Sequence, residues 1–161
     1  MAPAPDRLRV LMVCLGNICR SPTAEAMLRK KVHEAGLDDR IVVDSAGTAD
    51  YHVDSPPDRR AITHGERRGL AMRDLRGRQV ERADFDRFDW ILAMDEDNLA
   101  DLKRIRPAGS RAKVALLMSF APDAGAGEVP DPYHGGADGF EQVLDLAAAA
   151  ADGFIASVRS I

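Results

Sequence analysis

The 161-residue sequence has few cysteines, few aromatic residues and no long apolar run. Its two cysteines, Cys14 and Cys19, lie five residues apart, so we expect no disulfide framework and a reducing, cytoplasmic compartment. No apolar run approaches the roughly 20 residues that span a bilayer, which argues against a membrane partner. The formal net charge of −4 leaves no excess of basic residues, so general nucleic-acid binding is not expected either.

Several ligand-binding patterns are missing as well. The patterns G-x4-G-K-[ST] and G-x-G-x-x-G are both absent, which argues against ATP and NAD as ligands. There is no C-x-x-C or H-x3-H pair, and His33 and His64 have no partner at metal-ligand spacing. The sequence therefore predicts neither a cofactor nor a metal site.

The overall composition is typical of a globular protein, with 45% hydrophobic and 30% charged residues. The length suits one domain with a substantial core. The first residues contain no basic n-region followed by an apolar h-region, so they do not resemble a signal peptide. We expect residues 1–7 to form a flexible tail and residues 8–161 to form a single domain.

Apolar patterning predicts the secondary structure. Four short, nearly continuously apolar runs are typical of a parallel sheet covered on both faces. Helical patterns separate these runs. The alternation predicts an α/β fold: one three-layer domain with a central four-stranded, parallel, twisted sheet and helices on both faces. The predicted strands span residues 8–13, 40–44, 89–94 and 113–118, and the predicted helices residues 23–35, 58–69, 95–106 and 140–158.

The loop between the first strand and the first helix is the most informative segment. It reads C-L-G-N-I-C-R-S-P from Cys14 to Pro22, with Gly16 and Asn17 suited to left-handed backbone. Backbone N–H groups and the positive end of the helix dipole make such a loop an anion site. Thiols ionise readily in such a place, and an Arg fork such as that of Arg20 fits phosphate oxygens. The loop therefore predicts binding of inorganic phosphate or another oxyanion, and phosphoryl transfer through a cysteinyl-phosphate.

A second long loop is predicted at the same edge of the sheet. Residues 119–139 are rich in proline and glycine, and structureless loops longer than about 12–15 residues are usually functional or disordered. This loop carries Asp131 followed by Pro132. Taken alone, the pair predicts a simple Asp-Pro turn.

The motifs resemble those of a known family. The run from Cys14 to Pro22, together with Asp131-Pro132-Tyr133, closely resembles the low-molecular-weight protein tyrosine phosphatases. Residues 43–48 and 88–95 resemble the second strand and its loop, and the third strand, of that family. Length and element order agree over nearly the whole chain. The resemblance implies a metal-independent protein tyrosine phosphatase.

The resemblance also implies a role for individual residues. Cys14 would be the nucleophile, Arg20 would stabilise the transition state, and Asp131 would act as general acid and then as general base. Asn17 would hold the loop in its strained shape, and Ser21 would donate to the Cys14 sulfur. An acid is also required chemically, because a tyrosine leaving group with a pKa of about 10 is costly to expel as an anion. The loop amides would complete the phosphate site: Leu15, Gly16, Asn17, Ile18, Cys19 and Arg20.

The substrate-facing residues follow from the same comparison. Tyr51 and Tyr133, with His52, are expected to form apolar walls beside the anion site. Ile18 goes with tyrosine phosphatases, whereas phosphoarginine phosphatases of this fold tend to carry threonine there. Many relatives have a second tyrosine where this sequence has His134, so regulation by phosphorylation at two adjacent tyrosines is not expected.

Three further features have both a structural and a functional interpretation. Cys19 is either a packing residue or the partner of Cys14 in a protective disulfide. Asp95 is expected chiefly as a helix N-cap, and the resemblance adds a role in holding the active-site loops. The basic residues from Arg67 to Arg78 are expected chiefly to lie on a solvated face, and the alternative is that they steer acidic phosphopeptides.

Two other functions compete with the phosphatase. An arsenate reductase would need further cysteines outside the loop, and the sequence has none. A phosphate- or phosphoprotein-binding module would not need the thiol and the acid. The expected partners are phosphotyrosine proteins. Relatives act either on a bacterial tyrosine kinase and its targets or as secreted, host-directed enzymes, and the lack of a signal peptide favours the former.

Overall fold

The computed structural model describes residues 7–133 and 135–159. Of the expected N-terminal tail only Arg7 lies within these ranges, and His134 lies outside them. Four strands form one parallel sheet: β1 (Leu8–Cys14), β2 (Ile41–Gly47), β3 (Trp90–Ala93) and β4 (Lys113–Leu116), in the order β2-β1-β3-β4. The predicted four-stranded parallel sheet is confirmed.

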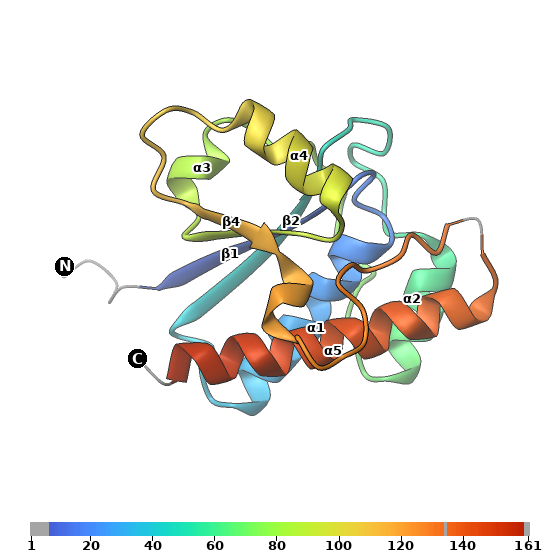
Figure 1. Ribbon diagram of the computed structural model, residues 1–161. Helices are drawn as coiled ribbons and strands as arrows, with labels where there is room; N and C mark the ends of the chain where they lie inside the picture. The colour runs from blue at the N-terminus through green and yellow to red at the C-terminus, as the bar shows by residue number, and fades with distance from the viewer. Residues whose placement is uncertain (1–6, 134, 160–161) are drawn as a thin grey trace.

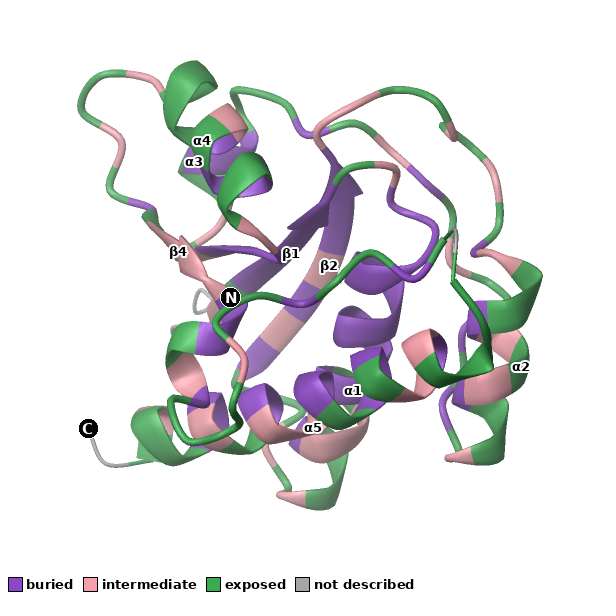
Figure 2. Ribbon diagram, turned by 45° about the vertical axis from the view of Figure 1, so that its right-hand side comes forward, coloured by how far each residue is buried: buried purple, intermediate pink, exposed green. Residues whose placement is uncertain are grey.

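Helices cover both faces of this sheet, as predicted (Figure 1). On one face lie α1 (Arg20–Glu34), α2 (Arg59–Arg67) and α5 (Ala137–Arg159), and on the other lie α3 (Asp84–Arg87) and α4 (Glu96–Ile105). Most of β1 and β3 is buried between these two layers of helices, whereas the edge strand β4 is only partly buried (Figure 2). Among the described residues, no helix is long and apolar enough to cross a membrane.

The sheet divides the core into two parts, because successive side chains of a strand point to opposite faces. In β1, Val10 and Met12 pack with residues of α1 and α5, whereas Leu11 and Val13 pack with Phe85 of α3 and with residues of α4. Both faces of β1 are therefore apolar. This explains why the strand reads as one continuous hydrophobic run rather than as an alternating one.

Several element boundaries differ from the sequence-based prediction; β2, for example, extends to Gly47 rather than ending at residue 44. The first helix begins at Arg20 rather than at residue 23, and the last begins at Ala137 rather than at residue 140. The fourth predicted strand ends at Leu116 and continues as a short 3-10 helix, η1 (Leu117–Phe120). The short helix α3 was not predicted, because four residues are too few to show helical periodicity.

Parallel strands bring their carboxyl ends to one edge of the sheet, which places three loops side by side. The loop after Cys14 borders the loop after β2, since Thr48 N donates to Cys14 O at 2.9 Å and Ala49 N to Leu15 O at 3.0 Å. The long loop is joined to the end of β3 by the bond from Val129 N to Met94 O, at 2.8 Å. All the candidate active-site segments therefore meet at this edge.

Candidate active site

The loop after Cys14 leads directly from the strand β1 into the helix α1. Cys14 is the last residue of β1 and Arg20 is the first residue of α1, so the sheet fixes the thiol and the helix fixes the guanidinium. Between them only Asn17 has a left-handed backbone, with φ 58°. Gly16, although suited to the same conformation, does not adopt it. It is needed for space instead, because a Cβ there would lie 3.0 Å from the His52 ring.

The thiol of Cys14 is buried and is approached by two polar groups. Asn17 N–H donates to Sγ at 3.2 Å, and the Ser21 hydroxyl lies 3.0 Å from Sγ. Both groups are able to donate to a thiolate. An ionised Cys14 is therefore accommodated without rearrangement of the loop.

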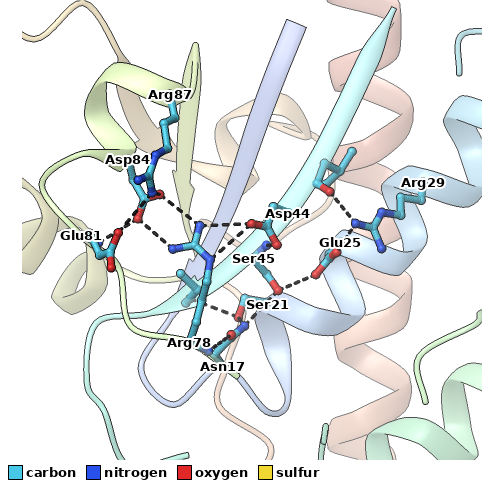
Figure 3. Close-up of polar contacts among 12 residues, drawn as sticks. Asn17, Ser21, Glu25, Arg29, Asp44, Ser45, Arg78, Glu81, Asp84 and Arg87 are labelled. Carbon is cyan, nitrogen blue, oxygen red and sulfur yellow. Dashed lines mark hydrogen bonds and ion pairs between the residues drawn. The ribbon is translucent and has the colours of Figure 1, made fainter. Parts of the chain in front are cut away.

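The side chain of Asn17 holds the loop in this shape (Figure 3). Its Nδ2 donates to Ser21 Oγ at 2.8 Å and to Ser45 Oγ at 3.0 Å, and its Oδ1 accepts from Arg78 N at 3.0 Å. These three bonds connect the loop to α1, to β2 and to the segment before α3. They offset the strain of left-handed backbone at a non-glycine residue.

Arg20 is 3% exposed and is held from one side of its guanidinium. Its Nη1 donates to Asp95 Oδ2 at 2.6 Å and to Val129 O at 3.1 Å. Burial lowers the pKa of Arg20, but the bond to Asp95 and the charges of Cys14, Asp95 and Asp131 outweigh it and raise the pKa overall. The guanidinium therefore stays charged despite its burial.

Asp95 was expected to cap a helix and to hold the active-site loops, and it makes a contact of each kind. Its Oδ1 accepts from Asn98 N at 2.8 Å, which caps α4, while its Oδ2 accepts from Arg20. One carboxylate thus fixes the start of a helix and the orientation of the Arg20 guanidinium.

Asp131 lies across the pocket from the loop after Cys14, and its side chain is nearly half exposed. Its Oδ1 accepts from Tyr133 N at 3.0 Å, so the expected Asp-Pro turn is present. Its Oδ2 lies 3.8 Å from Arg20 Nη2. Asp131 therefore both forms the turn and lies near the Arg20 guanidinium.

These residues enclose a pocket of about 230 Å³. Tyr51, 72% exposed, stands at its mouth, and Tyr133 forms another part of the rim. Asn17 and Ser21, which were grouped with the phosphate-binding residues, are buried and do not line the pocket; they lie behind its wall. The lining residues are Cys14, Leu15, Gly16, Ile18, Cys19, Arg20, Tyr51, His52, Asp131 and Tyr133.

Known proteins match the chain in both sequence and structure. The family model described as low molecular weight phosphotyrosine protein phosphatase matches residues 9–160. The chain belongs to this family. It is accordingly a hydrolase of the protein-tyrosine-phosphatase class, which confirms the resemblance found in the sequence.

Individual relatives of this phosphatase match it over most of their length. The low molecular weight phosphotyrosine protein phosphatase of Schizosaccharomyces pombe is 46% identical over 83% of this chain and 85% of its own. A protein tyrosine phosphatase from Entamoeba histolytica superposes with a TM-score of 0.91 at 38% identity, over 95% of this chain and 97% of its own. The Drosophila arginine phosphatase superposes with a TM-score of 0.88 at 32% identity, over 94% and 98%.

The second thiol of the phosphatase has a different environment from the first. Burial, reinforced by the charges of Asp58, Cys14 and Asp131, raises the pKa of Cys19 to about 12. Cys19 is therefore a neutral thiol at physiological pH. Both cysteines are free in this structure.

A polar network behind the phosphatase loop was missed by the sequence analysis. Ser45 Oγ donates to Glu25 Oε1 at 2.5 Å, and Glu25 Oε2 pairs with Arg29 at 2.6 Å (Figure 3). A signal for Glu25 was available, because Ser21, Glu25 and Leu28 share one face of α1 at helical spacing. The position of Ser45 depends on β2 pairing with β1 and has no local signal.

Arg78 was expected on a solvated face, and this is wrong. Its guanidinium binds Asp44 Oδ2 at 3.1 Å and Asp84 Oδ2 at 2.9 Å, and its N–H holds Asn17. Asp84 is fully buried. The ion pairs therefore fix the backbone that supports the phosphate-binding loop.

Glu25 makes the stability of the phosphatase depend on pH. Burial raises its pKa from 4.5 to about 7, although Arg29 and the bond from Ser45 act in the opposite direction. Glu25 therefore ionises at lower pH in the unfolded chain than in the folded one, and the free energy of unfolding falls between about pH 4.5 and pH 7, by about 3 kcal/mol.

The variant Glu25→Gln keeps an acceptor for Ser45 but does not titrate, so its free energy of unfolding should not show this fall. Urea unfolding of both proteins across this range measures it, and a pH-independent difference between them would contradict it.

Proposed function

We propose that this chain hydrolyses phosphotyrosine in proteins through a cysteinyl-phosphate intermediate. The observation that carries the proposal is that Cys14 and Arg20, from one loop, line the same pocket as Asp131, which comes from a loop far away in the sequence. The thiol lies at the bottom on β1, the guanidinium is clamped by Asp95, and the carboxyl group faces them from the long loop.

In the first step, Cys14 Sγ attacks the phosphorus atom as the bond to the phenolic oxygen breaks. Asp131 gives its proton to that oxygen, so the tyrosine leaves as a neutral phenol. Arg20 and the loop amides bind the three non-bridging oxygens, on which the transition-state charge is spread. The product of this step is S-phosphocysteine at position 14.

In the second step, water attacks the phosphorus atom and Asp131, now a carboxylate, takes a proton from it. The P–S bond breaks and Cys14 leaves as a thiolate, which accepts hydrogen bonds from Asn17 N–H and from the Ser21 hydroxyl. Inorganic phosphate is released, and Asp131 is again protonated. Each proton in the cycle is thus assigned to a group within the pocket.

Cys14 rather than Cys19 is the nucleophile in this proposal. Two donors converge on Cys14 Sγ, whereas Cys19 is kept neutral by burial and by nearby negative charges. If Cys14 is oxidised to a sulfenic acid, we expect Cys19, the other thiol of the same loop, to condense with it with loss of water and so to protect it as a disulfide.

Pocket shape supports an aryl phosphate as the substrate. Tyr51 and Tyr133 offer ring surface at the rim, while Ile18 forms part of the wall deeper in. The phenyl ring of phosphotyrosine carries its phosphate far enough from the peptide backbone to reach the buried thiol, whereas phosphoserine is shorter. The expected partners are phosphotyrosine proteins, a bacterial tyrosine kinase among them.

The substrate class is tested with one peptide sequence that carries phosphotyrosine, phosphoserine or phosphoarginine. With EDTA present throughout, we expect kcat/KM for phosphotyrosine to exceed that for phosphoserine by about 100-fold or more, because the site is matched to one leaving group and reach. We also expect kcat/KM for phosphoarginine to be lower than for phosphotyrosine, since Ile18 narrows the pocket. Phosphate release measures all three rates. Faster release from phosphoarginine would assign the site to that substrate, and loss of activity in EDTA would contradict the metal-independent mechanism.

A further inference from the structure

Arg60, on the first turn of α2, connects two loops that border the pocket. Its Nε and Nη2 donate to the two carboxylate oxygens of Asp58, each at 3.1 Å, and its Nη2 also donates to Tyr133 O at 3.0 Å. The guanidinium carbon lies 5.5 Å from the centre of the Tyr133 ring and 4.8 Å from that of Phe140. The side chain thus holds the rim tyrosine through its carbonyl and through its ring.

One end of this connection is attached to the phosphate-binding loop. Asp58 N donates to Ile18 O at 2.7 Å, and Asp58 Oδ1 caps α2 by accepting from Arg60 N at 2.8 Å. Burial raises the pKa of Asp58, but its bonds with Arg60 outweigh this and lower the pKa overall. Asp58 is therefore a carboxylate fixed against the wall that contains Ile18, and it orients the Arg60 fork.

The other end is attached to the acid. Asp131 Oδ1 accepts from Tyr133 N, so both residues belong to one turn. The hydrogen bond from Arg60 to the Tyr133 carbonyl therefore fixes the distance between that turn and the loop after Cys14. The path runs from Ile18 through Asp58, Arg60 and Tyr133 to Asp131, and each step is a hydrogen bond.

We propose that Arg60 is a positioning residue that holds Asp131 at the distance from the phosphate-binding loop at which it protonates the leaving group. The proposal rests on the acid role of Asp131 proposed above. Proton transfer needs the carboxyl group within hydrogen-bond reach of the leaving oxygen, and a displacement of about 1 Å can cost as much as 100-fold in rate. Arg60 is not among the residues that line the pocket, so it acts through the turn.

The variant Arg60→Met tests this, because methionine keeps apolar contact with the two rings and removes every donor. For phenyl phosphate, a poor leaving group, we expect kcat/KM to fall about tenfold. For p-nitrophenyl phosphate, whose phenol is a far stronger acid, the fall should be under about threefold, because that leaving group needs little protonation. Equal falls for both substrates would mean that Arg60 is only structural, and would overturn the proposal.

The adjacent residue provides a matched control. Arg59→Met removes the same charge from the same turn of α2, and the Arg59 side chain makes no hydrogen bond or ion pair with the described residues. We expect Arg59→Met to have the wild-type kcat/KM with both phenyl phosphate and p-nitrophenyl phosphate. A leaving-group effect of Arg59→Met equal to that of Arg60→Met would assign the effect to general charge and overturn the proposal. Should Arg60→Met fail to fold, Arg60→Lys, which loses the fork but keeps the charge, is judged by the same ratio of rates.

A double variant separates failure of this proposal from failure of the proposed function. If Asp131 is the acid, Asp131→Ala shows the leaving-group effect, and Arg60→Met added to it causes no further preferential loss with phenyl phosphate. If Asp131→Ala slows both substrates equally, the acid role itself is wrong. If Asp131→Ala behaves as expected while Arg60→Met shows no preference, or if the preferential loss persists in the double variant, only the role of Arg60 is overturned.

Discussion

Replacing Cys14 with serine is expected to lower turnover of aryl phosphates by a factor on the order of 10⁴ or more. Serine has nearly the same shape, and it keeps a polar atom within reach of Asn17 N–H and Ser21 Oγ. Its hydroxyl, however, stays protonated at neutral pH and is a weak nucleophile without an adjacent base. The change therefore removes the bond-forming group and leaves the oxyanion site in place. Steady-state hydrolysis of p-nitrophenyl phosphate measures the loss.

The other cysteine is the matched control for this prediction. Cys19→Ser makes the same chemical change in the same loop, and we expect a loss of at most about tenfold, because the amides and Arg20 stay in place. Intact-mass spectrometry of acid-quenched reactions should detect a phosphorylated protein for the wild type and for Cys19→Ser, but not for Cys14→Ser. Wild-type turnover by Cys14→Ser would contradict the cysteinyl-phosphate mechanism.

Replacing Asp131 with alanine is expected to slow substrates in proportion to how poor their leaving group is. For phenyl phosphate we expect kcat/KM to fall by about 10²- to 10³-fold, within the usual contribution of a general acid. The fall should be far smaller for p-nitrophenyl phosphate, since its phenolate leaves without a proton. A plot of log kcat/KM against leaving-group pKa should therefore be steeper for Asp131→Ala than for the wild type.

A second substitution at this position separates the acid role from the turn. Asp131→Asn retains an oxygen that can accept from Tyr133 N, so it keeps the turn, but its amide is not an acid. It should show the same steep dependence on the leaving group as Asp131→Ala. If Asp131→Asn were as fast as the wild type with phenyl phosphate, the residue would serve only the turn, and the general acid would have to be another group.

Much of the fold follows from local patterns in the sequence. The four strands were predicted because each contains a nearly continuous apolar run, which is typical of a sheet covered on both faces, and the sheet and its covering helices are confirmed. The run from Cys14 to Pro22 was recognised because the nucleophile, the arginine and the backbone between them lie within one segment, and the family assignment is confirmed. Element ends were less accurate: α1 begins three residues earlier than predicted, at Arg20.

The residues that support the loop had no comparable signal. Arg78 looked like one of several surface arginines. Only the bridge between its segment and the end of β2, from Gly47 to Gln79, brings it to Asp44 and Asn17. The same holds for Arg60 and Tyr133, which are far apart in sequence and adjacent at the rim. Charge and residue type gave no means to tell these arginines from solvated ones.

The sequence by itself determined the nine residues from Cys14 to Pro22, the parallel sheet and the family, because backbone preference, apolar periodicity and a contiguous motif are local properties. The tertiary structure decided what surrounds the loop. It placed Asp95 on Arg20, Ser45 and Glu25 behind Asn17, and the turn of Asp131 across the pocket. The physical reason is that directional polar contacts form between segments whose separation in space is fixed only when the sheet has assembled and the helices have packed on it.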